Sequence, residues 1–330
     1  MYAQDIVLIL LVLLICLISG YVLLYACFKE KLIELDKSLS LYILIGFVGL
    51  FYYIKVAFVI GLLGILYIEL LVFIALLTLA PAAYIYKKQS FVSLPALNLG
   101  HYFLFSLTLL LGLRTYFLFI GADDLSYHLP YARSFLENHS ITIEEHLIYP
   151  LHTLDINILF SILLMLDNEF VLRLFNIFTI SILAILIYDY LCQKVNCWLA
   201  ILAPLVIFGS TKIMFFALLV YVDFAFSIFI AIGFIAFLCW LDKQSSDQGT
   251  IYLTIAALAV AAAASTKYFG LVFGFMLFIF ILYCSKNKLK DIALFLLICA
   301  LFGSGWYLRN IIISGNPFHP FLSNIFGFYL

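Results

Sequence analysis

Long apolar runs dominate this chain, and short polar segments separate them. The first run covers residues 5–27, and later runs are of similar length. A helix needs roughly 20 apolar residues to cross the hydrocarbon core of a bilayer. A transmembrane β-barrel would instead show alternating segments of about ten residues. The pattern therefore predicts an all-α polytopic membrane protein.

We expect about ten transmembrane helices from the lengths of these runs. The stretch 41–86 is too long for one crossing, so it should form a hairpin that turns near Gly61 and Gly64. The stretch 151–166 is shorter and contains polar side chains, which favours a helix lying in the membrane interface. The other predicted crossings cover residues 5–27, 94–119, 170–191, 198–216, 222–241, 251–264, 268–284 and 292–307.

These segments divide the chain into three predicted parts. Residues 1–120 form an N-terminal membrane segment of four helices. Residues 121–169 form a long polar loop with juxtamembrane helices, and residues 170–330 form the remaining membrane core.

The distribution of lysine predicts the orientation. When the amino terminus is placed outside, most lysines fall on the cytoplasmic side, as the positive-inside rule requires. A full crossing at 151–166 would move Lys243 and the cluster of Lys286, Lys288 and Lys290 outside, which supports an interfacial helix there. We therefore expect a multi-pass protein of the plasma (inner) membrane whose polar loop is extracytoplasmic. The lysines on the predicted cytoplasmic side are Lys29, Lys31, Lys37, Lys87, Lys88, Lys194, Lys243, Lys286, Lys288 and Lys290.

Composition limits where polar chemistry can occur. The chain is 67% hydrophobic and 11% charged, so a densely polar loop is a candidate site. All seven cysteines lie within or beside apolar runs, which indicates neither a disulfide framework nor a zinc site. The histidines lack metal-ligand spacing, so we expect no metal site and no cofactor. The sequence does not exclude a divalent metal ion, but nothing in it indicates one.

The polar loop opens on two adjacent carboxylates, Asp123 and Asp124. A solvated loop or a helix cap is the alternative interpretation of this pair. Asp223 is predicted on the same side, at a helix start where the dipole also favours a carboxylate. Cations that break the positive-inside rule usually have a compensating partner, and a phosphate is a natural one. Such cations at predicted outer helix ends are Arg114, Arg133, Arg173, Lys212, Lys267 and Arg309.

Three stretches of the chain share the pattern of one family. Residues 123–130 read DDLSYHLP, residues 265–271 read STKYFGL, and residues 306–310 read WYLRN, followed by GNPFHPF at 315–321. Together they resemble the bacterial integral-membrane glycosyltransferases of the GT-C superfamily. Relatives include the protein O-mannosyltransferases and the lipid A aminoarabinose transferases.

The resemblance implies a GT-C-like fold with a long first extracytoplasmic catalytic loop. It also implies an inverting transferase that moves a sugar from a polyprenyl-phosphate donor to a hydroxyl acceptor. Asp123 matches the family's loop aspartate and is the expected base, with Asp124 as the alternative or as the residue that tunes it. Lys267 and Arg309 are expected to bind the donor phosphate, with Lys212 as a further candidate. The expected substrate-binding residues are Tyr127, His128, Arg133, Asp223, Asn310 and Asn316.

The chemistry fits these residue types. A carboxylate can accept the proton of the acceptor hydroxyl as the new bond forms. The leaving phosphate is already a good anion, so cations suffice to stabilise it. The acceptor is expected to be a glycolipid or a protein, and no nucleic acid is expected as a partner. Such enzymes usually continue through more spans, so we expect a fragment or a short member.

Two other classes compete with the enzyme. In a transporter or lipid flippase, intramembrane charges would line a pathway. The chain shows no internal repeat, and its charges gather at one face, which favours the enzyme. An inactive membrane scaffold subunit is the third hypothesis.

Overall fold

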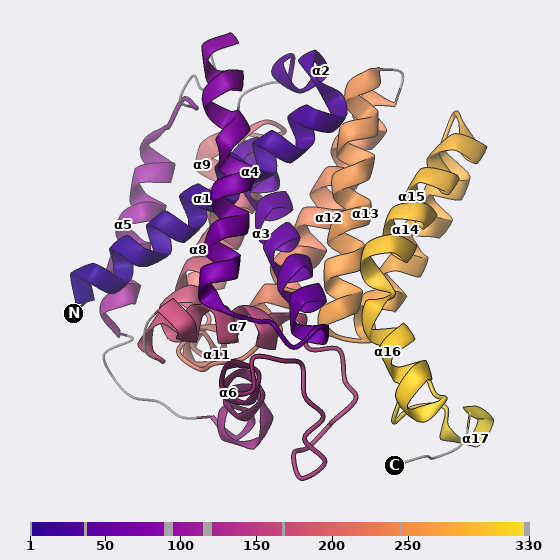
Figure 1. Ribbon diagram of the computed structural model, residues 1–330. Coiled ribbons are helices and arrows are strands. Elements are labelled where there is room, and N and C mark those ends of the chain that lie inside the picture. Colours follow the sequence, from indigo (N-terminus) through magenta and orange to yellow (C-terminus); the bar gives the residue numbers. More distant parts are fainter. Residues whose placement is uncertain are drawn as a thin grey trace.

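The structure is a computed structural model that describes residues 2–35, 38–88, 95–114, 121–166, 169–244 and 246–326. Within these ranges all regular secondary structure is helical (Figure 1). In chain order the helices are α1 (Tyr2–Phe28), α2 (Glu30–Ile33), α3 (Leu39–Leu62), α4 (Ile68–Lys88), α5 (Leu99–Arg114), the π-helix η1 (Asp124–His128), α6 (Leu129–Glu137), α7 (Asp155–Leu166), α8 (Phe170–Cys192), α9 (Cys197–Ala200), α10 (Leu202–Gly209), α11 (Thr211–Phe216), α12 (Asp223–Lys243), α13 (Asp247–Thr266), α14 (Phe269–Cys284), α15 (Lys288–Gly303), α16 (Gly305–Ser314) and α17 (Ser323–Phe326).

In the described part of the chain, six helices are long and apolar enough to cross a membrane: α1, α3, α4, α8, α12 and α13. The pair α15 and α16, bent by 54°, counts as a seventh if it forms one span. The predicted crossings at 198–216 and 268–284 correspond to the shorter apolar helices α9–α10 and α14. The predicted crossing at 94–119 contains α5, and its ends fall outside the described residues. The all-α polytopic fold is confirmed.

Helix α7 occupies the segment that was expected to lie in the membrane interface. It has 12 residues, which is too short for a crossing. Most of its side chains are buried, and it packs on α3, α6 and α8. The protein itself, rather than lipid, therefore covers much of its apolar surface.

The predicted hairpin at 41–86 is confirmed, since α3 and α4 meet in a turn at Gly64, where φ is 72°. The polar loop is attached to this turn by backbone hydrogen bonds. The amide of Ile141 donates to the carbonyl of Gly61 at 3.0 Å, and the amide of Leu66 donates to His139 at 2.8 Å. The polar loop and the α3–α4 turn therefore lie at the same end of the helix bundle.

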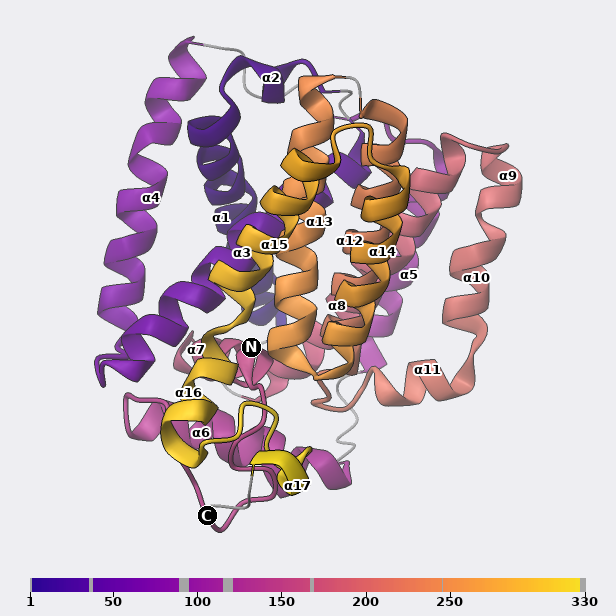
Figure 2. The same ribbon diagram turned by 90° about the vertical axis from the view of Figure 1, so that its right-hand side faces the viewer.

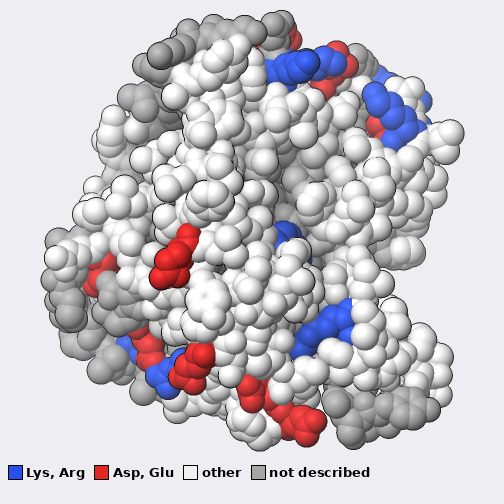
Figure 3. All heavy atoms as spheres, viewed as in Figure 1, with Lys and Arg blue, Asp and Glu red and all other residues white. Residues whose placement is uncertain are grey.

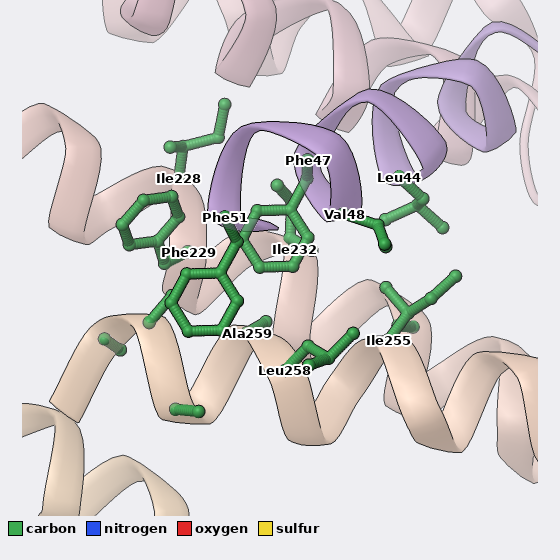
Figure 4. Packing of buried hydrophobic residues seen from close by; sticks show 14 of the residues in the cluster. Leu44, Phe47, Val48, Phe51, Ile228, Phe229, Ile232, Ile255, Leu258 and Ala259 are labelled. Carbon is green, nitrogen blue, oxygen red and sulfur yellow. The ribbon is translucent and has the colours of Figure 1, made fainter. Parts of the chain in front are cut away.

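The core lies where α3, α12 and α13 meet (Figure 4). The rings of Phe47 and Phe229 lie 5.5 Å apart there, and Ala259 of α13 lies beside them (Figure 4). Helix α13 is rich in alanine over residues 256–264, and small residues let membrane helices approach closely. The main buried cluster takes residues from all three predicted parts of the chain, so these parts share one core.

The two ends of the bundle carry different sets of charged side chains. One end carries α2 and the α14–α15 turn, and the other carries α6, α7, α16 and α17 (Figures 1 and 2). On the face in Figure 3, most acidic side chains lie in the half that holds α6. At the α2 end, Lys31 pairs with Asp247 at 2.7 Å, and Lys194 pairs with Asp242 at 2.7 Å. Lys37 lies outside the described residues, and the side chains of Lys87, Lys88 and Arg114 are not described.

Gly49→Ala tests the close packing of α1 on α3. A Cβ at Gly49 would lie 1.9 Å from the carbonyl oxygen of Cys16, so the two helices would have to separate. We expect a loss of about 1–3 kcal/mol in the free energy of unfolding, measured as a lower thermal midpoint in detergent. Gly46→Ala in the same helix is the control, because its Cβ would meet only the Cα of Leu17, at 4.0 Å. Equal midpoints for the two variants would contradict this packing.

Candidate active site

A cavity of about 520 Å³ lies at the end of the bundle that carries the polar loop. Residues from all three sequence motifs line it. Tyr127 and His128 come from the first motif, Lys267 and Tyr268 from the second, and Phe321 from the third. The fold therefore brings together three stretches that are far apart in the sequence.

Asp123 lies at the margin of this cavity and contacts its lining through Tyr127. The chain forms a π-helix from Asp124 to His128, a conformation that often occurs at functional sites. The phenol of Tyr127 donates a hydrogen bond to Asp123 Oδ2 at 3.1 Å. Burial and the nearby Asp123 carboxylate raise the pKa of Tyr127, so the phenol stays protonated as a donor. This bond fixes the Asp123 carboxylate beside the cavity.

Asp124 is buried and holds the loop in place. Its Oδ2 accepts the amide of Gly121 at 3.0 Å, and its Oδ1 accepts the amide of Val220, also at 3.0 Å. Burial raises the pKa of this carboxyl, while the two amide hydrogen bonds oppose the rise. Both oxygens thus accept backbone amides, one from the start of the polar loop itself and one from the segment before α12. This geometry favours Asp123 over Asp124 as the base.

Lys267 and Asp223 form an ion pair at the cavity. Lys267 follows the last residue of α13, and its ammonium lies 2.6 Å from Asp223 Oδ1 at the start of α12. The lysine side chain is 31% exposed and the aspartate side chain 54%. Pairs this exposed typically contribute only about 0–1 kcal/mol. A phosphate could therefore replace Asp223 as the partner of Lys267.

Two histidines of the cavity are neutral near pH 7. Burial and, to a smaller extent, the nearby Lys267 lower the pKa of His128 to about 4. Burial also lowers the pKa of His152 to about 4, with a contribution from the nearby His319. His128 contacts the amide of Asn157 at 3.3 Å. Among the described residues that line the cavity, Lys267 therefore supplies the positive charge.

Arg309 lies away from the cavity lining. It is buried, its guanidinium lies 5.1 Å from the ring centroid of Trp306, and its Nη2 donates to the carbonyl of Thr142 at 3.5 Å. The predicted phosphate contact of Arg309 is therefore not part of the observed geometry, and it stays a prediction.

The asparagines of the third motif shape the loops around the cavity. Asn310 donates to the carbonyl of Leu151 at 2.7 Å, which fixes the segment that leads to His152. Asn316 donates to the carbonyl of Phe321 at 2.8 Å, and its own Oδ1 accepts the amide of Phe318 at 2.9 Å. These bonds close the turn that carries Phe321 to the cavity. In this structure both asparagines support the site and neither lines it.

The other predicted cations are separate from this cavity. Lys212 is exposed on α11 and does not belong to the cavity lining. Arg133 forms an ion pair with Glu169, and Arg173 is buried in α8. The roles of Lys212 at the donor phosphate and of Arg133 in substrate binding stay predictions.

The sequence analysis missed several features of the site. Tyr149 and His152 line the cavity, although no motif singled them out. Lys55 and Asp155 form a buried ion pair at 2.7 Å behind it. Opposite charges inside two apolar runs are the signal that could have identified this pair. Within the described ranges, no cluster of three or more His, Cys, Asp or Glu residues is arranged to hold a metal ion.

Comparison with known proteins now adds to the geometry. Residues 149–311, almost half of the chain, match the sequence model of the dolichyl-phosphate-mannose-protein mannosyltransferases. The match includes the second motif, the WYLRN part of the third, and the segment with Tyr149 and His152. No curated protein and no solved structure matches the chain. The family match confirms the resemblance that the motifs indicated: over residues 149–311 the chain is similar to this glycosyltransferase family of the GT-C superfamily, and the match supports a membrane glycosyltransferase that uses a lipid-linked sugar.

Proposed function

We propose that this protein transfers a sugar from a polyprenyl-phosphate donor to a hydroxyl acceptor at the cavity between the three motifs. The observation that carries the proposal is that Lys267 lines the same cavity as Tyr127, whose phenol holds the carboxylate of Asp123. A transporter or a scaffold would not require this pairing of a base with a phosphate partner. The family match favours the enzyme as well.

The donor phosphate binds at Lys267 in this proposal. The phosphate takes the place of Asp223 as the partner of the ammonium, which the exposure of that ion pair permits. When the bond from the anomeric carbon to the phosphate oxygen breaks, the phosphodiester becomes a monoester and gains negative charge. A fixed cation stabilises this charge in the transition state. The leaving group therefore needs no general acid.

Asp123 acts as the base. The acceptor oxygen forms the bond to the anomeric carbon as its proton passes to the Asp123 carboxylate. Attack opposite the departing phosphate gives a single displacement, which inverts the configuration of the anomeric carbon. The hydrogen bond from Tyr127 keeps the carboxylate in position.

The sugar occupies the cavity between these groups. Tyr149, Tyr268 and Phe321 offer apolar ring faces, and His152 offers a neutral imidazole. Aromatic faces can pack against the C–H face of a sugar ring, and the neutral histidines can share hydrogen bonds with its hydroxyls.

We further propose that the cavity opens on the extracytoplasmic side of a plasma membrane. The distribution of lysine supports this orientation, because Lys194, Lys243 and Lys286 belong to the end of the bundle opposite the cavity. The acceptor is then a glycolipid or a protein on that side.

Asp123→Asn should reduce the rate of sugar transfer by at least about a hundredfold, because an amide cannot accept the proton of the acceptor hydroxyl. Transfer, donor binding and thermal stability are measured with purified protein in lipid nanodiscs. Donor binding and thermal stability should equal those of the unchanged protein. Asp242→Asn is the matched control, since Asp242 is an exposed aspartate paired with Lys194 at the opposite end. Unchanged transfer in Asp123→Asn would refute the base assignment.

Lys267→Ala should raise the KM for the donor about tenfold or more, because a charge-assisted contact to the phosphate is lost. Lys267→Arg should retain part of the affinity because it keeps the charge. Lys194→Ala serves as the control for removing a lysine from an exposed ion pair. Steady-state kinetics with varied donor concentration distinguish these cases. A donor KM in Lys267→Ala equal to that of the control would contradict the phosphate contact.

A further inference from the structure

A buried lysine, Lys55, contacts two segments that line the cavity without lining it itself. The Lys55 side chain, in α3, is only 13% exposed, and its ammonium lies 2.7 Å from Asp155 Oδ2. The same ammonium donates a hydrogen bond to Ser265 Oγ at 2.9 Å. Asp155 accepts a further hydrogen bond on Oδ1, from the indole N–H of Trp306 at 2.7 Å. One charged group thus links α3 to α7, α13 and, through Asp155, α16.

Both partners of Lys55 stand next to residues that line the cavity. Asp155 begins α7, and Leu154 and Asn157 on either side of it belong to the lining. Ser265 lies in the last turn of α13, two residues before Lys267. The position of one ammonium therefore bears on two separate segments that line the site, at the start of α7 and at the end of α13.

Stability alone does not account for a buried ion pair. Desolvation of the two charges offsets most of their attraction, and an apolar pair of similar volume often packs as well or better. Charges among membrane helices are expensive and usually functional. The pair also fixes the relative positions of the helices, because the Lys55 ammonium donates to acceptors on α7 and α13. Phe51 and Phe58 hold it from the sides, with ring centroids 5.0 and 5.5 Å from Nζ.

We propose that Lys55 is a positioning residue that fixes the end of α13 relative to the start of α7 and so places Lys267 for the donor phosphate. This inference rests on the proposed function of the cavity. Lys55 does not line the cavity itself. It acts through Ser265 on one side and Asp155 on the other.

Ser265→Ala is the first test, because it removes the acceptor on α13 and leaves the Lys55–Asp155 ion pair in place. We expect the KM for the donor to rise about three- to tenfold, the equivalent of one lost hydrogen bond, with little change in the thermal midpoint. The matched control is Ser181→Ala in α8. Ser181 is also a buried serine, and its hydroxyl bonds only the carbonyl of Ile177 in its own helix.

The double variant Lys55→Met with Asp155→Asn is the second test. It removes both charges together, so no uncompensated charge stays buried, and the asparagine can still accept from Trp306. We expect it to fold and to show a donor KM raised at least as much as in Ser265→Ala. If the role of the ion pair were purely structural, a double variant with a normal thermal midpoint would have the donor KM of the unchanged protein.

Three outcomes decide the proposal. A raised donor KM with a normal thermal midpoint in both variants supports it. An unchanged donor KM in both variants overturns it, and so does a change that merely follows the thermal midpoint. Asp123→Asn and Lys267→Ala are measured in the same assay: if they impair transfer while the positioning variants do not, only the role of Lys55 fails. If all four leave transfer unchanged, the proposed function fails.

Discussion

Inside a bilayer, every polar group must find its partner within the protein, because the hydrocarbon offers none. This constraint accounts for the helical structure and for the concentration of polar loops at the two ends of the bundle. It also accounts for the pairing of Lys55 with Asp155 and Trp306, since an isolated charge at that depth would be far more costly. The site forms where such internal pairing meets a loop that is open enough to admit a substrate.

Backbone hydrogen bonds assemble the site as much as direct contacts between its functional groups do. Asp124 ties the polar loop to the segment before α12, and Asn310 ties the end of that loop to α16. Both oxygens of Asp124 and the amide nitrogen of Asn310 are used in holding backbone atoms. Asp123 and Lys267, which are more exposed, are left at the cavity with partners that a substrate can displace or share. Burial thus separates the residues that hold the loops from the residues that are available to a substrate.

Local pattern predicted the helices and the turn at Gly64, because apolar runs and glycine act over short distances. Tyr127 and Lys267, which two of the motifs contain, line one cavity in the structure. The sequence preferred Asp123 to Asp124 only through the match to the family motif, since the physical difference between them depends on the distant amide of Val220. It also missed the burial of Arg309, which packs against Trp306 one turn earlier in its own helix. Long-range packing decides such cases, and it leaves no local pattern in a single sequence.

The central claim is that the donor phosphate binds at the Lys267 end of the cavity. The most direct measurement is photo-cross-linking of the full chain in nanodiscs with a polyprenyl phosphate that carries a diazirine near its phosphate, followed by peptide mapping. The account predicts adducts within residues 266–272 and 149–157, which flank the cavity, and loss of these adducts when unlabelled polyprenyl-phosphate sugar competes. Adducts confined to other segments, or adducts that the unlabelled donor does not suppress, would contradict it.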